Sequence, residues 1–344
     1  MTLPLPPPPP LLPCPPAAGW ELVSATLLPR RDAAGKQSGG FSAAAYLGEA
    51  DQLWLLSDAP RGRLSGWTGL AAAGPGLSGA GAAVLKPIGS LDLQGGPQAV
   101  LPAAIDGEGL VIDGDRIWVA SEGRRTPDRV AALYRFGRAD GRLRATLPLP
   151  PDWQAAPGRG LAANRGPESL ALLRRDGAPW LLSAAESPLL QDAPGRLRLL
   201  AWPLDDEGNP ADQSLPLRPL GLPSRGDWGL TELLAVPGRL GVSAGLLALQ
   251  RRFEAPDRWG ARLALYPLPG PERPDEPPLA PLFSWNLLQL GVPADNWEGM
   301  TAGPPLSDGR PTLVLVSDDN FSPLQNNHLV RLAPRRGPGC TTPP

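Results

Sequence analysis

Histidine and cysteine are nearly absent from this chain of 344 residues, which contains one His and two Cys. Without a Cys/His cluster or a CxxC pair, the sequence excludes a structural zinc site. Cys14 and Cys340 stand in proline-rich segments near opposite ends of the chain, where they either pair with each other or stay as two free thiols. No apolar run approaches the ~18 residues that indicate a membrane-spanning helix, so we expect no transmembrane segment.

An excess of one charge is also missing, because 32 Lys and Arg face 34 Asp and Glu for a formal net charge of −2. Nucleic-acid-binding proteins carry a basic face that neutralises phosphates. We therefore expect no nucleic-acid partner. The expected partner is a small-molecule substrate or ligand, bound by a monomer.

Proline dominates the first 16 residues, MTLPLPPPPPLLPCPP. Because proline fixes φ and lacks an N–H group, we predict a disordered arm over residues 1–18. A disordered tail over 334–344 and a single domain over 19–333 complete the predicted organisation. The arm lacks the basic start and helical apolar stretch of a signal peptide. The sequence as written therefore favours the cytoplasm, or export if the true start lies upstream.

Elsewhere the 41 glycines and 47 prolines punctuate short apolar segments, and the 11 tryptophans and 42% apolar content argue against disorder. One pattern occurs five times: an apolar strand, a polar turn, and a second apolar strand that ends in a polar or charged residue. The copies include GEGLVIDGDRIWVASEG from Gly107 and WEGMTAGPPLSDGRPTLVLVSDDN from Trp297. The five copies are aligned here on Phe41, Glu108, Glu168, Leu230 and Glu298.

Two more strand patterns follow in several units, as in VAALYRF and RLRATLPL after Glu122. Four-stranded units that repeat around a centre are typical of a β-propeller. After the last hairpin only one further strand remains, so GWELVSATLLP at 19–29 is expected to supply the fourth strand and close the ring. We predict an all-β propeller of five blades, with six as the alternative because 66–105 is weakly patterned.

Several motifs, above all NWEGM followed by SDDNF and also NRGPES, resemble the phytase-like family, which is described as having esterase-like activity. The resemblance covers residues 19–333 and implies a β-propeller with phosphatase or esterase activity. One departure is Gln250, where the resemblance implies a glutamate.

The repeat also predicts a site, because the first strand of each blade lines the channel of a propeller. Glu108, Glu168, Glu232 and Glu298 stand near the starts of such strands and are expected to point to a common centre. Crowded carboxylates repel one another unless a cation is present, and oxygen-only ligands favour Ca²⁺, with Mg²⁺ second. The predicted metal ligands are Glu108, Glu168, Glu232, Glu298, Asp318, Asn164 and Asn296. Alternatively, the acids pair with arginines and only fix the blades.

Nucleophilic catalysis finds little support, since there is no Gly-x-Ser-x-Gly elbow and His328, the single histidine, is expected to lie on the surface. Metal-assisted hydrolysis of phosphate or carboxylic esters fits better, with Glu298 or Glu168 as the base. Arg165, Arg124 and Arg251 are the predicted substrate-binding residues. Two alternatives stay open: a Ca²⁺-dependent lactonase-like propeller, and a non-catalytic propeller with an aromatic mouth. The candidate mouth residues are Trp153, Trp228, Trp259 and Trp297.

Overall fold

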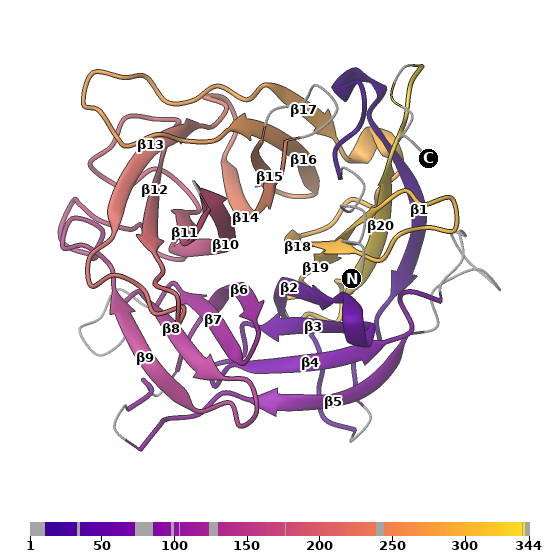
Figure 1. Cartoon of the computed structure of the whole chain (residues 1–344), viewed down its shortest axis with the longest axis horizontal. Helices are drawn as coiled ribbons and strands as arrows, with labels where there is room; N and C mark the ends of the chain where they lie inside the picture. The colour runs from indigo at the N-terminus through magenta and orange to yellow at the C-terminus, as the bar shows by residue number, and fades with distance from the viewer. Residues whose placement is uncertain are drawn as a thin grey trace, which may run out of the picture.

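Five antiparallel sheets of four strands each stand in a ring around a central channel (Figure 1). The computed structural model describes residues 11–32, 35–72, 85–97, 100–102, 104–123, 130–175, 177–238, 244–338 and 340. Each sheet is one blade, and β2, β6, β10, β14 and β18 are the innermost strands. The five-bladed propeller predicted from the repeat is confirmed, and the segment 66–105 adds the outer strand of blade one rather than a sixth blade.

The strands follow one another along the chain from the inside of each blade to its outside. Blade one holds β2 (Phe41–Leu47), β3 (Gln52–Ser57), β4 (Arg63–Thr68) and β5 (Lys86–Asp92), and blade two holds β6 (Gly107–Asp113), β7 (Arg116–Ser121), β8 (Ala132–Gly137) and β9 (Leu143–Pro148). Blade three holds β10 (Pro167–Arg175), β11 (Ala178–Ala185), β12 (Arg196–Pro203) and β13 (Leu215–Gly221), and blade four holds β14 (Trp228–Val236), β15 (Gly245–Glu254), β16 (Arg258–Pro267) and β17 (Phe283–Asn286). Blade five holds β18 (Trp297–Gly303), β19 (Thr312–Ser317), β20 (His328–Pro334) and β1 (Trp20–Leu27).

Helix is confined, in the described part of the chain, to the short 3₁₀ turns η1 (Pro16–Ala18), η2 (Gly48–Ala50) and η3 (Leu288–Leu290). None of these turns has the length or the apolar character needed to cross a membrane. The connections are rich in Gly, Pro and Asp, which favour turns and disfavour longer helices.

The ring is closed by the N-terminal strand, as predicted: β1 pairs antiparallel with β20 and becomes the outer strand of blade five. Cys14 and Cys340 form a disulfide, and the backbone N–H of Cys14 donates to the Arg335 carbonyl at 3.1 Å. Leu12 is buried in the same region. Residues 11–18, which proline content led us to expect as an unpaired arm, are therefore fastened to the closing blade, whereas residues 1–10 lie outside the described residues.

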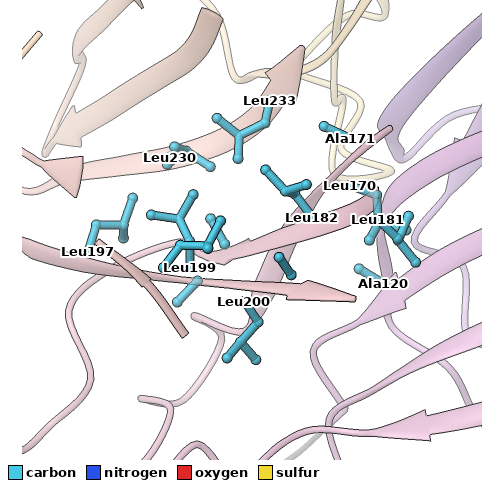
Figure 2. Packing of buried hydrophobic residues seen from close by; sticks show 14 of the residues in the cluster. Ala120, Leu170, Ala171, Leu181, Leu182, Leu197, Leu199, Leu200, Leu230 and Leu233 are labelled. Atoms are coloured by element: carbon cyan, nitrogen blue, oxygen red, sulfur yellow. The ribbon is translucent and has the colours of Figure 1, made fainter. Parts of the chain in front are cut away.

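Apolar side chains fill the space between neighbouring blades, because alternate residues of a strand point to the same face of its sheet. Figure 2 shows part of the largest cluster, in which Leu181 of β11 lies beside Ala120 of β7, while Leu199 of β12 and Leu230 of β14 lie on the other side of β11. Each fully buried leucine contributes about 1.5–3 kcal/mol relative to exposure. The clusters join one blade to the next and hold the innermost strands in place.

A β-bulge interrupts the pairing at the same level of every innermost strand. A bulge leaves one residue unpaired and bends the strand. The unpaired residues are Ser42, Glu108, Glu168, Thr231 and Glu298. Two glycines follow directly after bulges, and an added Cβ at Gly109 would lie 2.8 Å from the Ser169 carbonyl carbon of the next blade. The bulges thus bring five side chains to one level of the innermost strands.

Candidate functional site

The five bulge residues form an inner ring at the channel. Two of them are hydroxyl residues that link blades: Ser42 Oγ donates to the Gly107 carbonyl at 2.6 Å, and Thr231 Oγ1 donates to the Trp297 carbonyl at 3.1 Å. The other three are Glu108, Glu168 and Glu298. The alignment on Phe41 and Leu230 was wrong by one residue, since Ser42 and Thr231 are the structural counterparts of these glutamates.

A second ring lies where the second strands end, with one residue from each blade. It consists of Asp58, Glu122, Glu186, Arg251 and Asp318. Each of these residues pairs with the residue two positions before the bulge residue of its blade. In blade four Arg251 pairs with Gly229, and in blade five the Asp318 N–H donates to the Asn296 carbonyl. Four blades therefore supply a carboxylate, and blade four supplies an arginine.

Gln250, the departure noted in the sequence, does not occupy this ring. It is fully buried inside blade four, where its Nε2 donates to the Tyr266 hydroxyl at 3.0 Å and its Oε1 accepts from Arg262 Nε at 2.7 Å. The residue that changes the charge of the second ring is its neighbour Arg251.

The side chain of Arg251 neutralises one arc of the two rings. Its Nη2 and Nε lie 2.9 and 3.0 Å from Glu298 Oε1, and its Nη1 lies 3.5 Å from Glu186 Oε1. Arg165 approaches the same Glu186 oxygen at 3.5 Å and also pairs with Asp227. Two of the three predicted substrate-binding arginines are thus engaged by carboxylates, and Arg124 lies outside the described residues.

Protonation follows from this arrangement. Burial raises the pKa of Glu298 to about 7, although Arg251 opposes the shift. Burial and then the Glu186 carboxylate hold the pKa of Glu168 well above its usual range. Near neutral pH, Glu298 is therefore poised between its two forms, while burial favours the protonated form of Glu168.

The opposite arc gathers Asp106, Glu108 and Glu122, which each offer a carboxylate oxygen within 4.8 Å of the others. The side chains of Asp106 and Glu122 share a hydrogen bond, and Glu122 Oε2 also accepts from the Gly166 N–H at 3.1 Å. Burial and then Asp106 raise the pKa of Glu122 to about 8. Asp106 belongs to this arc but was not among the predicted ligands. Its position two residues before Glu108 is the one feature of the sequence that could have indicated it.

Asp58 lies beside this arc and carries the same signs of crowding. Burial and then Asp318 raise its pKa to about 8. The next groups that act on the Asp58 carboxyl are Asp106, Glu298 and Asp319, all of them carboxylates. Its Oδ1 is buried without a hydrogen-bond partner among the described residues.

The remaining predicted ligands are scattered. Asn296 Nδ2 donates to Asp318 Oδ2 at 3.3 Å, which keeps both at the second ring. Asn164 is instead exposed in a turn with φ +57°. Glu232 follows the bulge by one residue and lines an apolar cavity of about 190 Å³ between the innermost strands, where its Oε1 accepts from the Leu233 N–H at 2.9 Å.

His328, expected as a surface residue, is held inside blade five. Its Nδ1 lies 2.6 Å from Asp295 Oδ2, which also accepts from Ser317 Oγ at 3.0 Å. The carboxylate stands between the hydroxyl and the imidazole, so these three residues do not form a serine nucleophile activated by a histidine. Of the proposed aromatic mouth, Trp153 and Trp297 belong to the core.

The chain is similar to one known family and to several solved structures. The family model "Phytase-like: Esterase-like activity of phytase" matches residues 36–321. Among solved structures, a thermostable family-43 glycoside hydrolase is 11% identical, with 93% of this chain and 98% of that chain covered and a TM-score of 0.46. The periplasmic gluconolactonase of Pseudomonas aeruginosa is 14% identical, with 90% and 88% covered and a TM-score of 0.37. No curated protein matches the chain. The match over 36–321 shows that the chain belongs to the phytase-like family.

Proposed function

We propose that this protein is a divalent-cation-dependent hydrolase of phosphate or carboxylic esters, with Ca²⁺ as the first choice of cation and Mg²⁺ as the second. The observation that supports it is the arc of Asp106, Glu108 and Glu122, whose carboxylate oxygens lie within 4.8 Å of one another. Carboxylates this close repel unless protons or a cation lie between them.

The residues present fit a hard cation. All donors in the arc are carboxylate oxygens, which Ca²⁺ and Mg²⁺ prefer. The hydrogen bond between Asp106 and Glu122 requires a proton that a cation would replace, and the orphaned Asp58 Oδ1 lies nearby. Asp106, Glu108 and Glu122 would hold the ion, and Asp58 would offer it a further carboxylate oxygen. A bound ion would polarise the ester oxygen and lower the pKa of water.

The other arc supplies the groups that move protons. Glu298, with a pKa of about 7, is suited to accept the proton of the attacking water. Arg251 fixes its orientation by contacting Oε1, which leaves Oε2 without a hydrogen-bond partner among the described residues. Burial holds the pKa of Glu168 well above its usual range, which suits this residue to donate a proton to the leaving group.

The test is hydrolysis of 4-nitrophenyl phosphate and 4-nitrophenyl acetate by protein stripped of metal, with and without added Ca²⁺ or Mg²⁺. We expect activity that requires the cation and is lost in Glu122→Gln. The exposed Glu49 provides a matched control, and Glu49→Gln should keep full activity. Turnover that survives metal removal, or no turnover of either ester, would contradict the proposal.

A non-catalytic binding propeller is the second candidate. It is favoured by the contacts of Arg251 and Arg165 with Glu186, because paired charges at a channel mouth fix the blades without any chemistry. Ca²⁺ binding without turnover of either ester would support this candidate over the hydrolase.

A further inference from the structure

We propose that a basic cleft on blade one, beside the channel mouth, is a binding site for a multi-oxygen anion. Its role as the subsite for the anionic part of a substrate rests on the proposed function, but the binding itself does not. The cleft has a volume of about 980 Å³ and lies between the chain around 31–39, the segment 57–65 and the end of β5. Arg165 and Arg251, the two predicted arginines that the structure describes, do not line it.

Charge distinguishes this cleft from the channel mouth. Among the described residues, four cationic side chains line it, namely Arg31, Lys36, Arg61 and Arg63, against the single carboxylate of Asp92. Asp92 is largely occupied, since its Oδ1 lies 2.7 Å from Arg63 Nε and its Oδ2 lies 4.0 Å from Lys36 Nζ. The cleft therefore keeps an excess of positive charge that an anion would neutralise.

Two of these cations have donors to spare. Arg61 is exposed and makes no hydrogen bond or ion pair with the described residues. Arg31 is also exposed, and its Nη1 donates to the carbonyl of Gly35 in its own loop at 2.8 Å, its one side-chain hydrogen bond to a residue that the structure describes. A guanidinium presents five donors in a planar fork that suits phosphate, sulfate and carboxylate oxygens. Arg31 and Arg61 are thus available to a ligand, unlike Arg251 and Arg165.

The inner end of the cleft lies beside the backbone that packs on Asp58. Ser57, which immediately precedes Asp58, lines it together with Gly39 and Phe321. The backbone there packs directly on the acid, because a Cβ added at Gly40 would lie 2.2 Å from Asp58 Oδ1 and 2.5 Å from the Phe321 ring. An anion in the cleft would therefore lie beside the backbone that packs on Asp58, at the edge of the channel mouth.

The test uses pyrophosphate as the probe, titrated calorimetrically into the full chain at low salt in buffer freed of metal ions with a chelating resin. We expect saturable binding that weakens at least tenfold in the double variant Arg31→Gln/Arg61→Gln. The matched control removes two exposed arginines of blade four and its outer loop, Arg258 and Arg273. Arg258→Gln/Arg273→Gln should bind pyrophosphate as the native chain does.

Absence of pyrophosphate binding to the native chain would overturn the proposal, as would equal binding by the cleft variant or equal weakening in both variants. Sulfate and citrate titrations then distinguish a phosphate-type ligand from a carboxylate-type one. A Ca²⁺ titration of the cleft variant separates this proposal from the proposed function. A cleft variant that still binds Ca²⁺ but no longer binds pyrophosphate supports the anion site. If the native chain itself does not bind Ca²⁺, only the metal-dependent hydrolase is contradicted.

Discussion

Arg251 occupies in blade four the place that Glu186 occupies in blade three, and its Nη1 lies 3.5 Å from the Glu186 carboxylate. The substitution of a cation for an anion at one of five equivalent positions divides the channel mouth into unlike halves. One half carries its own counter-charge, and the other, around Glu108 and Glu122, leaves its carboxylates facing one another. This asymmetry gives the ring separate places for a cation and for a proton acceptor.

Arg251→Met should destabilise the protein by about 3 kcal/mol, because Glu186 and Glu298 would lose their buried partner. Urea unfolding followed by tryptophan fluorescence measures the loss. The next residue offers the control: Arg252 pairs with the half-exposed Glu254, so Arg252→Met should cost at most about 1 kcal/mol. Equal effects of the two substitutions would show that Arg251 is not the counter-ion of the ring.

Stability without metal should fall as the pH rises. The fold raises the pKa of Asp58 from 3.8 to about 8 and that of Glu298 from 4.5 to about 7. The folded state therefore binds more protons than the unfolded state between these limits, so stability is full below pH ~4 and is lost as the pH approaches 8. We expect the melting temperature of the metal-free protein to drop by on the order of 5 °C between pH 5 and pH 8.

Asp58→Asn tests the origin of this slope, since it removes one of the titrating groups and keeps its shape. The drop in melting temperature should become smaller in this variant. A slope that Asp58→Asn leaves unchanged would assign the pH dependence to other groups.

The repeat in the sequence was sufficient for the five blades, their four strands and the closure by residues 19–29, because each blade repeats the same alternation of apolar segments. It was insufficient for the register. A bulge adds one residue to one strand and leaves no mark in the hydrophobic pattern. Ring positions were therefore assigned to Phe41, Leu230, Glu232 and Gln250, each of which lies one residue from the residue that occupies the ring. The cations of the cleft come from loops and β4, which the repeat does not describe.

Close approach of the innermost strands makes Gly109 a sensitive position. A Cβ there would lie 2.8 Å from the Ser169 carbonyl carbon and 2.9 Å from the Leu170 nitrogen, and neither backbone atom can move without shifting β10. Gly109→Ala should therefore destabilise the protein by about 2–3 kcal/mol in urea unfolding. Gly270, where an added Cβ meets nothing within 4 Å, is the control, and Gly270→Ala should change stability by less than about 0.5 kcal/mol.

The disulfide between Cys14 and Cys340 joins the two ends of the chain beside β1 and β20, the strands whose pairing closes the ring. The bond spans 326 residues, and closing so long a loop destabilises the unfolded chain by about 6 kcal/mol in the chain-entropy model. Cys14→Ser/Cys340→Ser should unfold at lower urea concentration by an amount within that limit. Because the chain has no other cysteine, dithiothreitol should lower the stability of the native protein to that of the variant and leave the variant unchanged.

Equilibrium dialysis of metal-stripped protein against radioactive Ca²⁺ tests the metal site most directly. The arrangement of Asp106, Glu108 and Glu122 predicts one saturable site at neutral pH, lost in Glu108→Gln/Glu122→Gln and kept in Glu49→Gln/Glu207→Gln, which removes two exposed carboxylates. Absence of a saturable site, or a site that survives Glu108→Gln/Glu122→Gln, would contradict the account.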